Sequence, residues 1–187
     1  DCVNSLLVQR MPGLRILIID NASTDDSVEV AQQLAAENAA IEVVARRRNL
    51  GPHASFNEAI DWAAQKYFLL LCADDQSAPG ALSRAVAVLE RHPNVALAYG
   101  RAAPLGPEGP PLPADRGPDK GWRILSGRQL LSRFCGTAVC HIAGCTAVVR
   151  TAVFLLIVRD SAVSIASLHD FRILRQHLVV ELLSTLF

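Results

Sequence analysis

Residues 15–25 read Arg-Ile-Leu-Ile-Ile-Asp-Asn-Ala-Ser-Thr-Asp, and this stretch decides the fold. The continuous apolar run at 16–19 suits a strand buried on both faces, and it ends abruptly in polar residues. A helical pattern follows, with Ser23 or Thr24 as its cap and Asp25 in a first turn where acidic groups favour the helix dipole. A buried strand that turns into an amphipathic helix is the building unit of a parallel sheet.

The same design repeats along the first half of the chain. Strands are expected at 41–45 and 67–72, each followed by a helix that starts near a proline, and a further strand is expected at 95–99. This repetition predicts an α/β fold with a mostly parallel, Rossmann-like sheet and helices on both of its faces.

Composition divides the chain into three parts. Residues 1–100 carry the alternating pattern, and residues 101–121 are rich in Pro and Gly, which is typical of a long loop. Residues 122–187 form the second half of the same domain. Three elements are expected there: a helix at 126–134, an extended segment at 138–149 and a helix at 168–186.

Charge limits the classes of binding partner, and cysteine content indicates the cellular compartment. Basic and acidic side chains number 18 each among 187 residues, so no global basic field exists to hold nucleic acid or an anionic membrane. Five cysteines, an odd number, favour a reducing compartment, so we expect a cytoplasmic protein, free or peripheral at the inner membrane face. No apolar run approaches the roughly 18 residues of a transmembrane helix.

Several enzyme classes lose support because their motifs are absent from the sequence. These motifs are the phosphate loop, the Gly-rich dinucleotide turn, the nucleophile elbow of hydrolases and the His-Glu-x-x-His zinc helix. Cys135, Cys140, His141 and Cys145 match no common zinc spacing, and we interpret them as part of a buried strand of small residues.

Polar clusters follow three of the expected strands. In a doubly wound sheet ligands bind beyond the carboxyl ends of the strands, so one crevice would gather all three clusters. The adjacent carboxylates of Asp74 and Asp75 suit Mg²⁺ or Mn²⁺ beside substrate phosphates. Each cluster taken alone also fits a polar turn, and Arg46, Arg47 and Arg48 also fit a solvated rim. The clusters are Asp20 with Asn21, then Arg48, Asn49 and Gly51, and then Asp74 with Asp75.

Taken together, the order and spacing of the three clusters resemble family 2 glycosyltransferases, which have the GT-A fold. The resemblance covers residues 5–100. It implies transfer of a sugar from a nucleoside-diphosphate sugar to a hydroxyl of a glycan or lipid-linked acceptor, with inversion and with metal assistance. Asp20, Asn21, Arg48, Asn49, Gly51 and Asp74 would contact the nucleotide.

The resemblance also assigns a metal and a base. Asp75, assisted by Asp74, would hold Mg²⁺ or Mn²⁺, although many family members carry Asp where this chain has Cys72. Asp170, in a stretch similar to a late acidic helix start of the family, would serve as general base. The Gly-Gly-Phe-Asp type of turn that usually precedes this helix is absent from 151–167.

The chain lacks the first strand of the family, and this difference has two possible explanations. The family begins with a central strand of the type Val-Ser-Val-Ile-Ile-Pro-Thr-Tyr-Asn, and residues 2–9 resemble the helix just after it. Either the chain is truncated, or it is a degenerate relative with a gap in its sheet, in which case a non-catalytic module that binds a nucleotide or partner is the alternative. A nucleotidyltransferase is disfavoured because it would carry a Gly-rich, Lys-containing loop.

Overall fold

The computed structural model describes residues 1–103, 105, 121–137, 142–153 and 176–182. Helices and strands alternate through the first hundred residues, as the hydrophobic pattern predicts. The helices are α1 (Cys2–Leu7), α2 (Ser27–Glu37), α3 (Pro52–Trp62), α4 (Ala81–Arg91) and α5 (Gly127–Thr137), with a 3-10 turn at Gly144–Thr146. The strands are β1 (Arg15–Asp20), β2 (Ile41–Ala45), β3 (Tyr67–Cys72), β4 (Leu97–Ala98), β5 (Val148–Arg150) and β6 (Gln176–Leu182).

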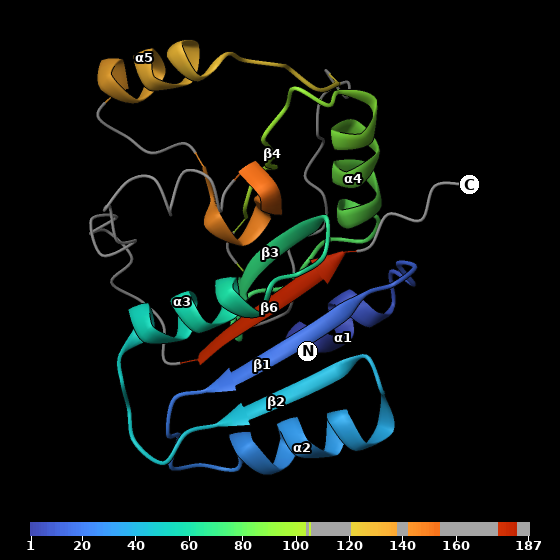
Figure 1. Cartoon of the computed structure of the whole chain (residues 1–187), viewed down its shortest axis with the longest axis vertical. Helices are drawn as coiled ribbons and strands as arrows, with labels where there is room; N and C mark the ends of the chain where they lie inside the picture. The colour runs from blue at the N-terminus through green and yellow to red at the C-terminus, as the bar shows by residue number, and fades with distance from the viewer. Residues whose placement is uncertain (104, 106–120, 138–141, 154–175, 183–187) are drawn as a thin grey trace.

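The six described strands form one sheet in the order β2-β1-β6-β3-β5-β4 (Figure 1). β1 and β2 are parallel, and both β1 and β3 are antiparallel to β6, so β1, β2 and β3 share one direction. β4 joins them in that direction because β5 is antiparallel to both β3 and β4. The mixed α/β architecture and its parallel strands agree with the predicted fold class.

Helices cover both faces of this sheet. Ile16 of β1 packs with apolar residues of α1, α2 and α4, whereas its neighbour Leu17 packs with Ala59 and Trp62 of α3 on the opposite face. This alternation follows from the pleat, because successive side chains of a strand point to opposite faces. The continuous apolar run at 16–19 therefore fills two cores at once, which explains why it contains no polar residue.

The carboxyl ends of β1 and β3 lie level across β6. His177 of β6 pairs with Ile19 of β1 on one side and with Cys72 of β3 on the other, and Gln176 pairs with Asp20. The polar residues that follow β1 and β3 therefore leave the sheet at the same edge.

Hydrogen bonds join β3, α4 and β5 at the amino-terminal end of β3, which is opposite to the end that carries Cys72. The buried Tyr67 hydroxyl donates to Oε1 of Glu90 at 3.0 Å and accepts from Nη1 of Arg150 at 3.2 Å. Nη2 of Arg150 also donates to the carbonyl of Leu89 at 2.8 Å, and Lys66 forms an ion pair with Glu90 at 2.7 Å.

The second half of the chain departs from several predictions. The helix at 126–134 is confirmed as α5, but the predicted helix at 168–186 is wrong where the structure describes it, because 176–182 form β6. Residues 176–182 form a strand because they pair with β1 and β3. Local helix propensity carries no information about such long-range pairing. The expected extended segment at 138–149 contains the 3-10 turn, and its strand begins only at Val148. Most of the Pro-rich loop lies outside the described residues.

Candidate active site

Asp20, the last residue of β1, is a buried carboxylate that is only half satisfied. Its residue is 3% exposed, and its Oδ2 accepts a hydrogen bond from the backbone N–H of Ser23 at 2.9 Å. Its Oδ1 is buried and has no hydrogen-bond partner. A buried acceptor without a partner costs free energy, so this oxygen is suited to accept a hydrogen bond from a ligand.

Asn21 ties the end of β1 to the loop after β2. Its Nδ2 donates to Oδ1 of Asn49 at 2.8 Å, and its Oδ1 accepts from the backbone N–H of Leu50 at 2.9 Å. The same oxygen accepts from Nη1 of Arg46 at 3.1 Å. The first two predicted clusters, from β1 and from β2, thus meet through Asn21 and Asn49.

Arg46 links this junction to helix α3. Its side chain is 9% exposed, donates to Oγ of Ser55 at 2.9 Å and forms an ion pair with Glu58. The interpretation of the arginine run as a solvated rim is therefore wrong for Arg46, whereas Arg47 and Arg48 are exposed as that interpretation predicts. Arg48 is exposed and lies at the rim of this junction.

Two backbone conformations shape the loops around this junction. Gly51 has φ +83°, in the left-handed region that favours glycine, and its N–H donates to Oδ1 of Asn49 at 2.8 Å. Ala22, directly after Asn21, also has a positive φ of 65°, which costs an L-residue free energy. Strain of this kind persists where surrounding contacts hold it, often at a ligand site.

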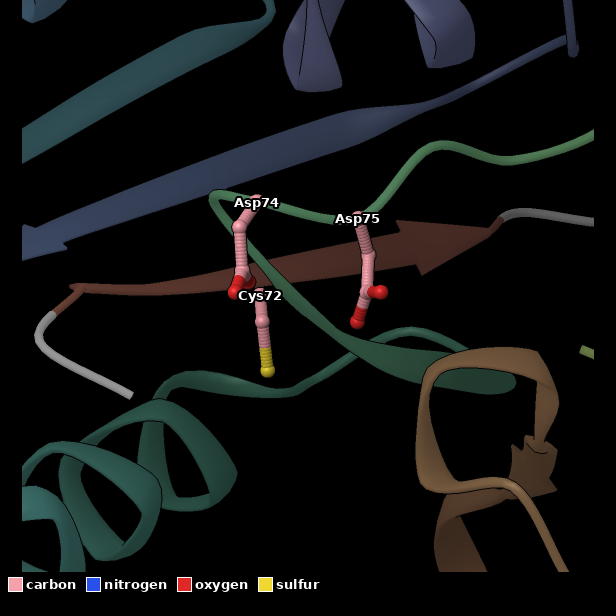
Figure 2. Close-up of side chains that lie close together, drawn as sticks. All are labelled: Cys72, Asp74 and Asp75. Atoms are coloured by element: carbon pink, nitrogen blue, oxygen red, sulfur yellow. The ribbon is translucent and has the colours of Figure 1, made fainter. Parts of the chain in front are cut away.

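The turn after β3 forms a second cluster, made of Cys72, Asp74 and Asp75. Figure 2 shows their side chains on the same side of the turn, and one ligand atom from each lies within 4.8 Å of the others. The turn is closed by the N–H of Asp75, which donates to the carbonyl of Cys72 at 3.0 Å. Asp74 is exposed, and Asp75 is partly buried.

The charge of this cluster is not balanced by a described cation. Burial and the neighbouring Asp74 carboxylate raise the pKa of Asp75, and a hydrogen bond from Cys145 partly opposes that rise. Burial and the Asp75 carboxylate also raise the thiol pKa of Cys72 to about 12 and that of Cys145 to about 11. A positive charge placed here would stabilise the ionised forms of these groups.

The cluster fits a divalent ion. Two ligand atoms that each lie about 2.4 Å from one ion, on opposite sides of it, are about 4.8 Å apart, so the observed spacing is compatible with a shared ion. Two carboxylates suit Mg²⁺ or Mn²⁺, whereas a thiol at Cys72 favours a softer ion than Mg²⁺. The donor set therefore fits Mn²⁺ better than Mg²⁺.

Helix α1 holds the segment that follows the acidic turn. Oγ of Ser5 accepts from the N–H of Ser77 at 2.9 Å, and Nε2 of Gln9 donates to Oγ of Ser77 at 3.0 Å. The thiol of Cys2 donates to the carbonyl of Cys72 at 3.2 Å. These bonds fix the position of the Asp74–Asp75 turn relative to α1.

A hollow of about 290 Å³ lies beside the end of β1 and extends towards the turn after β3. Asp20 from β1 and Ala73, next to Asp74, both line it, together with the starts of α1 and α2. Small-molecule pockets span roughly 300–1,000 Å³, so this hollow suits part of a ligand such as a nucleoside. A larger ligand would extend from it over the acidic turn.

Two residues of the site were missed by sequence reasoning, and one predicted residue is not described. Arg46 stands first in a run of three arginines, and its burial comes from tertiary contacts with Asn21, Ser55 and Glu58. Cys145 reaches Asp75 through a tertiary contact and carries no local signal. Cys135 is exposed on α5 and Cys145 lies half-buried on the 3-10 turn, so the interpretation of a buried strand is wrong for both, and Cys140 and His141 lie outside the described residues. Asp170 lies outside the described residues.

Within the described part of the chain, none of the helices combines the length and apolar character needed to cross a bilayer.

Known proteins resemble this chain over part of its length. A family model described as Glycosyl transferase family 2 matches residues 1–156. The uncharacterized glycosyltransferase YibD of Escherichia coli (strain K12) is 37% identical over 78 residues, which are 42% of this chain and 22% of that protein. The putative glycosyltransferase EpsE of Bacillus subtilis (strain 168) is 31% identical over 93 residues, which are 49% of this chain and 34% of EpsE.

A third relative carries a more specific name. The poly(ribitol-phosphate) beta-glucosyltransferase of Bacillus spizizenii (strain ATCC 23059 / NRRL B-14472 / W23) is 34% identical over 87 residues, covering 45% of this chain and 14% of that protein. The chain thus spans about a third or less of the length of these relatives.

Proposed function

The chain belongs to glycosyl transferase family 2, and from this membership we propose that it moves a sugar from a nucleoside-diphosphate sugar to an acceptor hydroxyl with inversion at the anomeric carbon. The observation that carries the proposal is the half-satisfied carboxylate of Asp20 in a hollow that reaches the Asp74–Asp75 turn. One ligand could therefore place its nucleoside beside Asp20 and its diphosphate at the Asp74–Asp75 turn.

The nucleoside would occupy the hollow. The free Oδ1 of Asp20 accepts a hydrogen bond from an N–H of the base or a ribose hydroxyl, which removes the cost of its burial. Asn21 and Asn49 act mainly by holding the two loops in place, since their side chains already bond to each other. Gly51 and the exposed Arg48, in the loop after β2, would contact the diphosphate.

Asp75, assisted by Asp74 and with Cys72 beside them, would hold a Mn²⁺ or Mg²⁺ ion. When bound, such an ion supplies positive charge against the charge that develops on the diphosphate leaving group. The protein's own part is to keep the two carboxylates adjacent, which the Asp75-to-Cys72 backbone hydrogen bond does. The bonds from α1 then restrict movement of the turn.

Asp170 would take the proton of the attacking acceptor hydroxyl, as a carboxylate within hydrogen-bond reach does in general base catalysis. The acceptor would be a glycan or a lipid-linked saccharide. A relative whose name specifies poly(ribitol-phosphate) supports a polymeric acceptor that carries hydroxyl groups. The free thiols of the described cysteines support a cytoplasmic location, at the inner face of the membrane where lipid-linked acceptors lie.

Calorimetry followed by a turnover assay tests the proposal. The chain is titrated with UDP-, GDP- and dTDP-sugars, with and without Mn²⁺, and released nucleoside diphosphate is then measured. We expect one donor class to bind more tightly with Mn²⁺ and to be hydrolysed slowly without acceptor. Asp75→Ala should lose the effect of Mn²⁺, whereas Asp170→Ala should keep donor binding and lose turnover.

Asp61→Ala, on the exposed surface of α3, is the matched control and should behave like the unmodified chain. If no sugar nucleotide binds in any of these conditions, the proposal is wrong. Metal-dependent binding with no turnover in the unmodified chain would instead support the non-catalytic nucleotide-binding module.

A further inference from the structure

Helix α5 lies at the surface of the described structure. None of its residues is buried, Leu130 and Phe134 are half-buried, and Figure 1 shows the helix (gold) set apart from the sheet. Its start is stabilised locally by a capping box: Oγ of Ser126 accepts from the N–H of Gln129 at 3.2 Å, and the N–H of Ser126 donates to Oε1 of Gln129 at 2.8 Å. Local capping therefore supports the first turn of this surface helix.

The segment 121–137, which contains α5, exposes large apolar side chains. Trp122 is 46% exposed, Ile124 54% and Leu131 62%. With 3.6 residues per turn, Leu131 shares one face of the helix with Leu130 and Phe134. Exposed apolar residues gathered on one segment indicate a surface that is covered in use.

The charge of this segment has a single sign. Arg123, Arg128 and Arg133 are its charged residues, and no acidic residue occurs from 121 to 137, although the whole chain has no net charge. The three arginines line one open hollow of about 460 Å³. None of them forms an ion pair within the described parts of the chain. Arg128 and Arg133 lie on the two sides of the apolar face, since they flank it in helical projection.

From this arrangement we propose that 121–137 is a docking surface for an anionic phospholipid bilayer. Trp122, Ile124 and Leu131 enter the boundary between headgroups and acyl chains, and the arginines bind the lipid phosphates. Amphipathic helices with basic flanks and an aromatic or aliphatic face bind membranes in this way. A phosphate-binding site for a soluble ligand needs the arginines but not the apolar side chains. A protein partner would need an acidic surface beside an apolar one to match this segment, whereas an anionic bilayer supplies both the negative charge and an apolar layer.

The inference concerns binding alone and does not depend on sugar transfer. If both hold, the helix brings the site to the face where a lipid-linked acceptor is presented. The absence of a net positive charge does not oppose it, because attraction to an anionic surface falls off within about 10 Å and is set by nearby charges.

Vesicle flotation of the whole chain tests the proposal, with vesicles of phosphatidylcholine alone and vesicles that also contain about one third phosphatidylglycerol. We expect binding to the anionic vesicles only, and weaker binding at high salt. Arg128→Glu with Arg133→Glu should lower the partition coefficient by about tenfold or more. The matched control, Arg10→Glu with Arg91→Glu, changes the charge of two exposed residues elsewhere by the same amount and should leave binding nearly unchanged.

Trp122 reports whether the apolar face enters the bilayer. In a Trp62→Phe background, Trp122 is the remaining tryptophan, and its emission should shift to shorter wavelength with anionic vesicles but not with inorganic phosphate. An equal shift with phosphate, equal binding to neutral vesicles, or an equal loss in the control pair would overturn the proposal. So would self-association through α5 without vesicle binding, measured by analytical ultracentrifugation.

Discussion

Nδ2 of Asn21 donates a 2.8 Å hydrogen bond to Oδ1 of Asn49 and thereby joins the end of β1 to the loop after β2. The other side-chain atom of Asn21 accepts from Leu50 N–H and from Arg46. One buried amide thus satisfies partners from two loops, and the ligand-facing surface is organised before any ligand arrives. Preorganisation of this kind lowers the entropic cost of binding.

Asn21→Ala should destabilise the fold by about 1–3 kcal/mol, because it leaves the Leu50 N–H and the Arg46 guanidinium without their acceptor. Urea unfolding followed by circular dichroism measures the change. Asn94→Ala, at an exposed position, should shift the free energy of unfolding by no more than about 0.5 kcal/mol. Equal effects of the two substitutions would show that the junction does not contribute as described.

Asp20→Asn should separate ligand binding from stability. An asparagine keeps an acceptor for the Ser23 N–H but places an amide nitrogen where the free oxygen now lies. We expect a change in unfolding free energy below about 1 kcal/mol and a loss of sugar-nucleotide affinity of about tenfold, as for one hydrogen bond to a charged group. Calorimetry measures the affinity, and Asp61→Asn is the control. Unchanged affinity in Asp20→Asn would exclude contact of this carboxylate with the nucleoside.

Cys72→Asp should change which ion supports donor binding. It replaces a thiol with a third carboxylate, and hard oxygen ligands favour Mg²⁺ relative to softer ions. We expect the preference for Mn²⁺ over Mg²⁺ to fall by about tenfold, measured by competition of Mg²⁺ against Mn²⁺ in electron paramagnetic resonance titrations. Cys135→Asp, on exposed α5, should leave the preference unchanged. A constant preference in Cys72→Asp would mean that this side chain does not touch the ion.

Tyr67→Phe should alter how stability depends on alkaline pH. Burial raises the pKa of the Tyr67 phenol, the Glu90 carboxylate adds to that rise, and Arg150 partly opposes it. The unfolded chain loses this proton near pH 10, below the raised pKa of the folded state. The contribution of Tyr67 is therefore complete below about pH 10 and is lost as the pH rises through the folded pKa.

Urea unfolding between about pH 8 and pH 11 tests this sign. At pH 8 the variant should be less stable by about 1–2 kcal/mol, because the bonds to Glu90 and from Arg150 are gone. The difference should shrink towards pH 11. A gap between Tyr67→Phe and the unmodified chain that widens with pH would contradict the assignment.

Local patterns predicted much of the first hundred residues. The apolar run before Asp20 and the proline at position 52 marked strand and helix boundaries because burial and backbone restriction act on neighbouring residues. Asn21 and Asn49 were expected at one edge because parallel strands place their carboxyl ends together. The hydrogen bond between Asn21 and Asn49 is a tertiary contact, and the expected sheet topology was enough to predict that the two residues lie close together.

Long-range contacts explain what the sequence did not predict. The strand at Gln176–Leu182 depends on partners more than a hundred residues away, and its own composition also suits a helix. Cys145 lies near Asp75 only because β5 pairs with β3 and the 3-10 turn precedes β5. Neither relationship leaves a periodic or spacing signal in the chain.

The position of β6 also fixes the order in which the fold is completed. β1 and β3 are separated from each other by a slot that residues 176–182 fill, and these residues leave the ribosome after both strands and their helices. Until then the inner edges of β1 and β3 have no partner among the described strands and expose hydrogen-bonding groups to other chains. Because the central strand comes from a distant part of the chain, folding is slow and unpaired strand edges favour aggregation. Expression at low temperature or with chaperones should therefore raise the yield of folded protein.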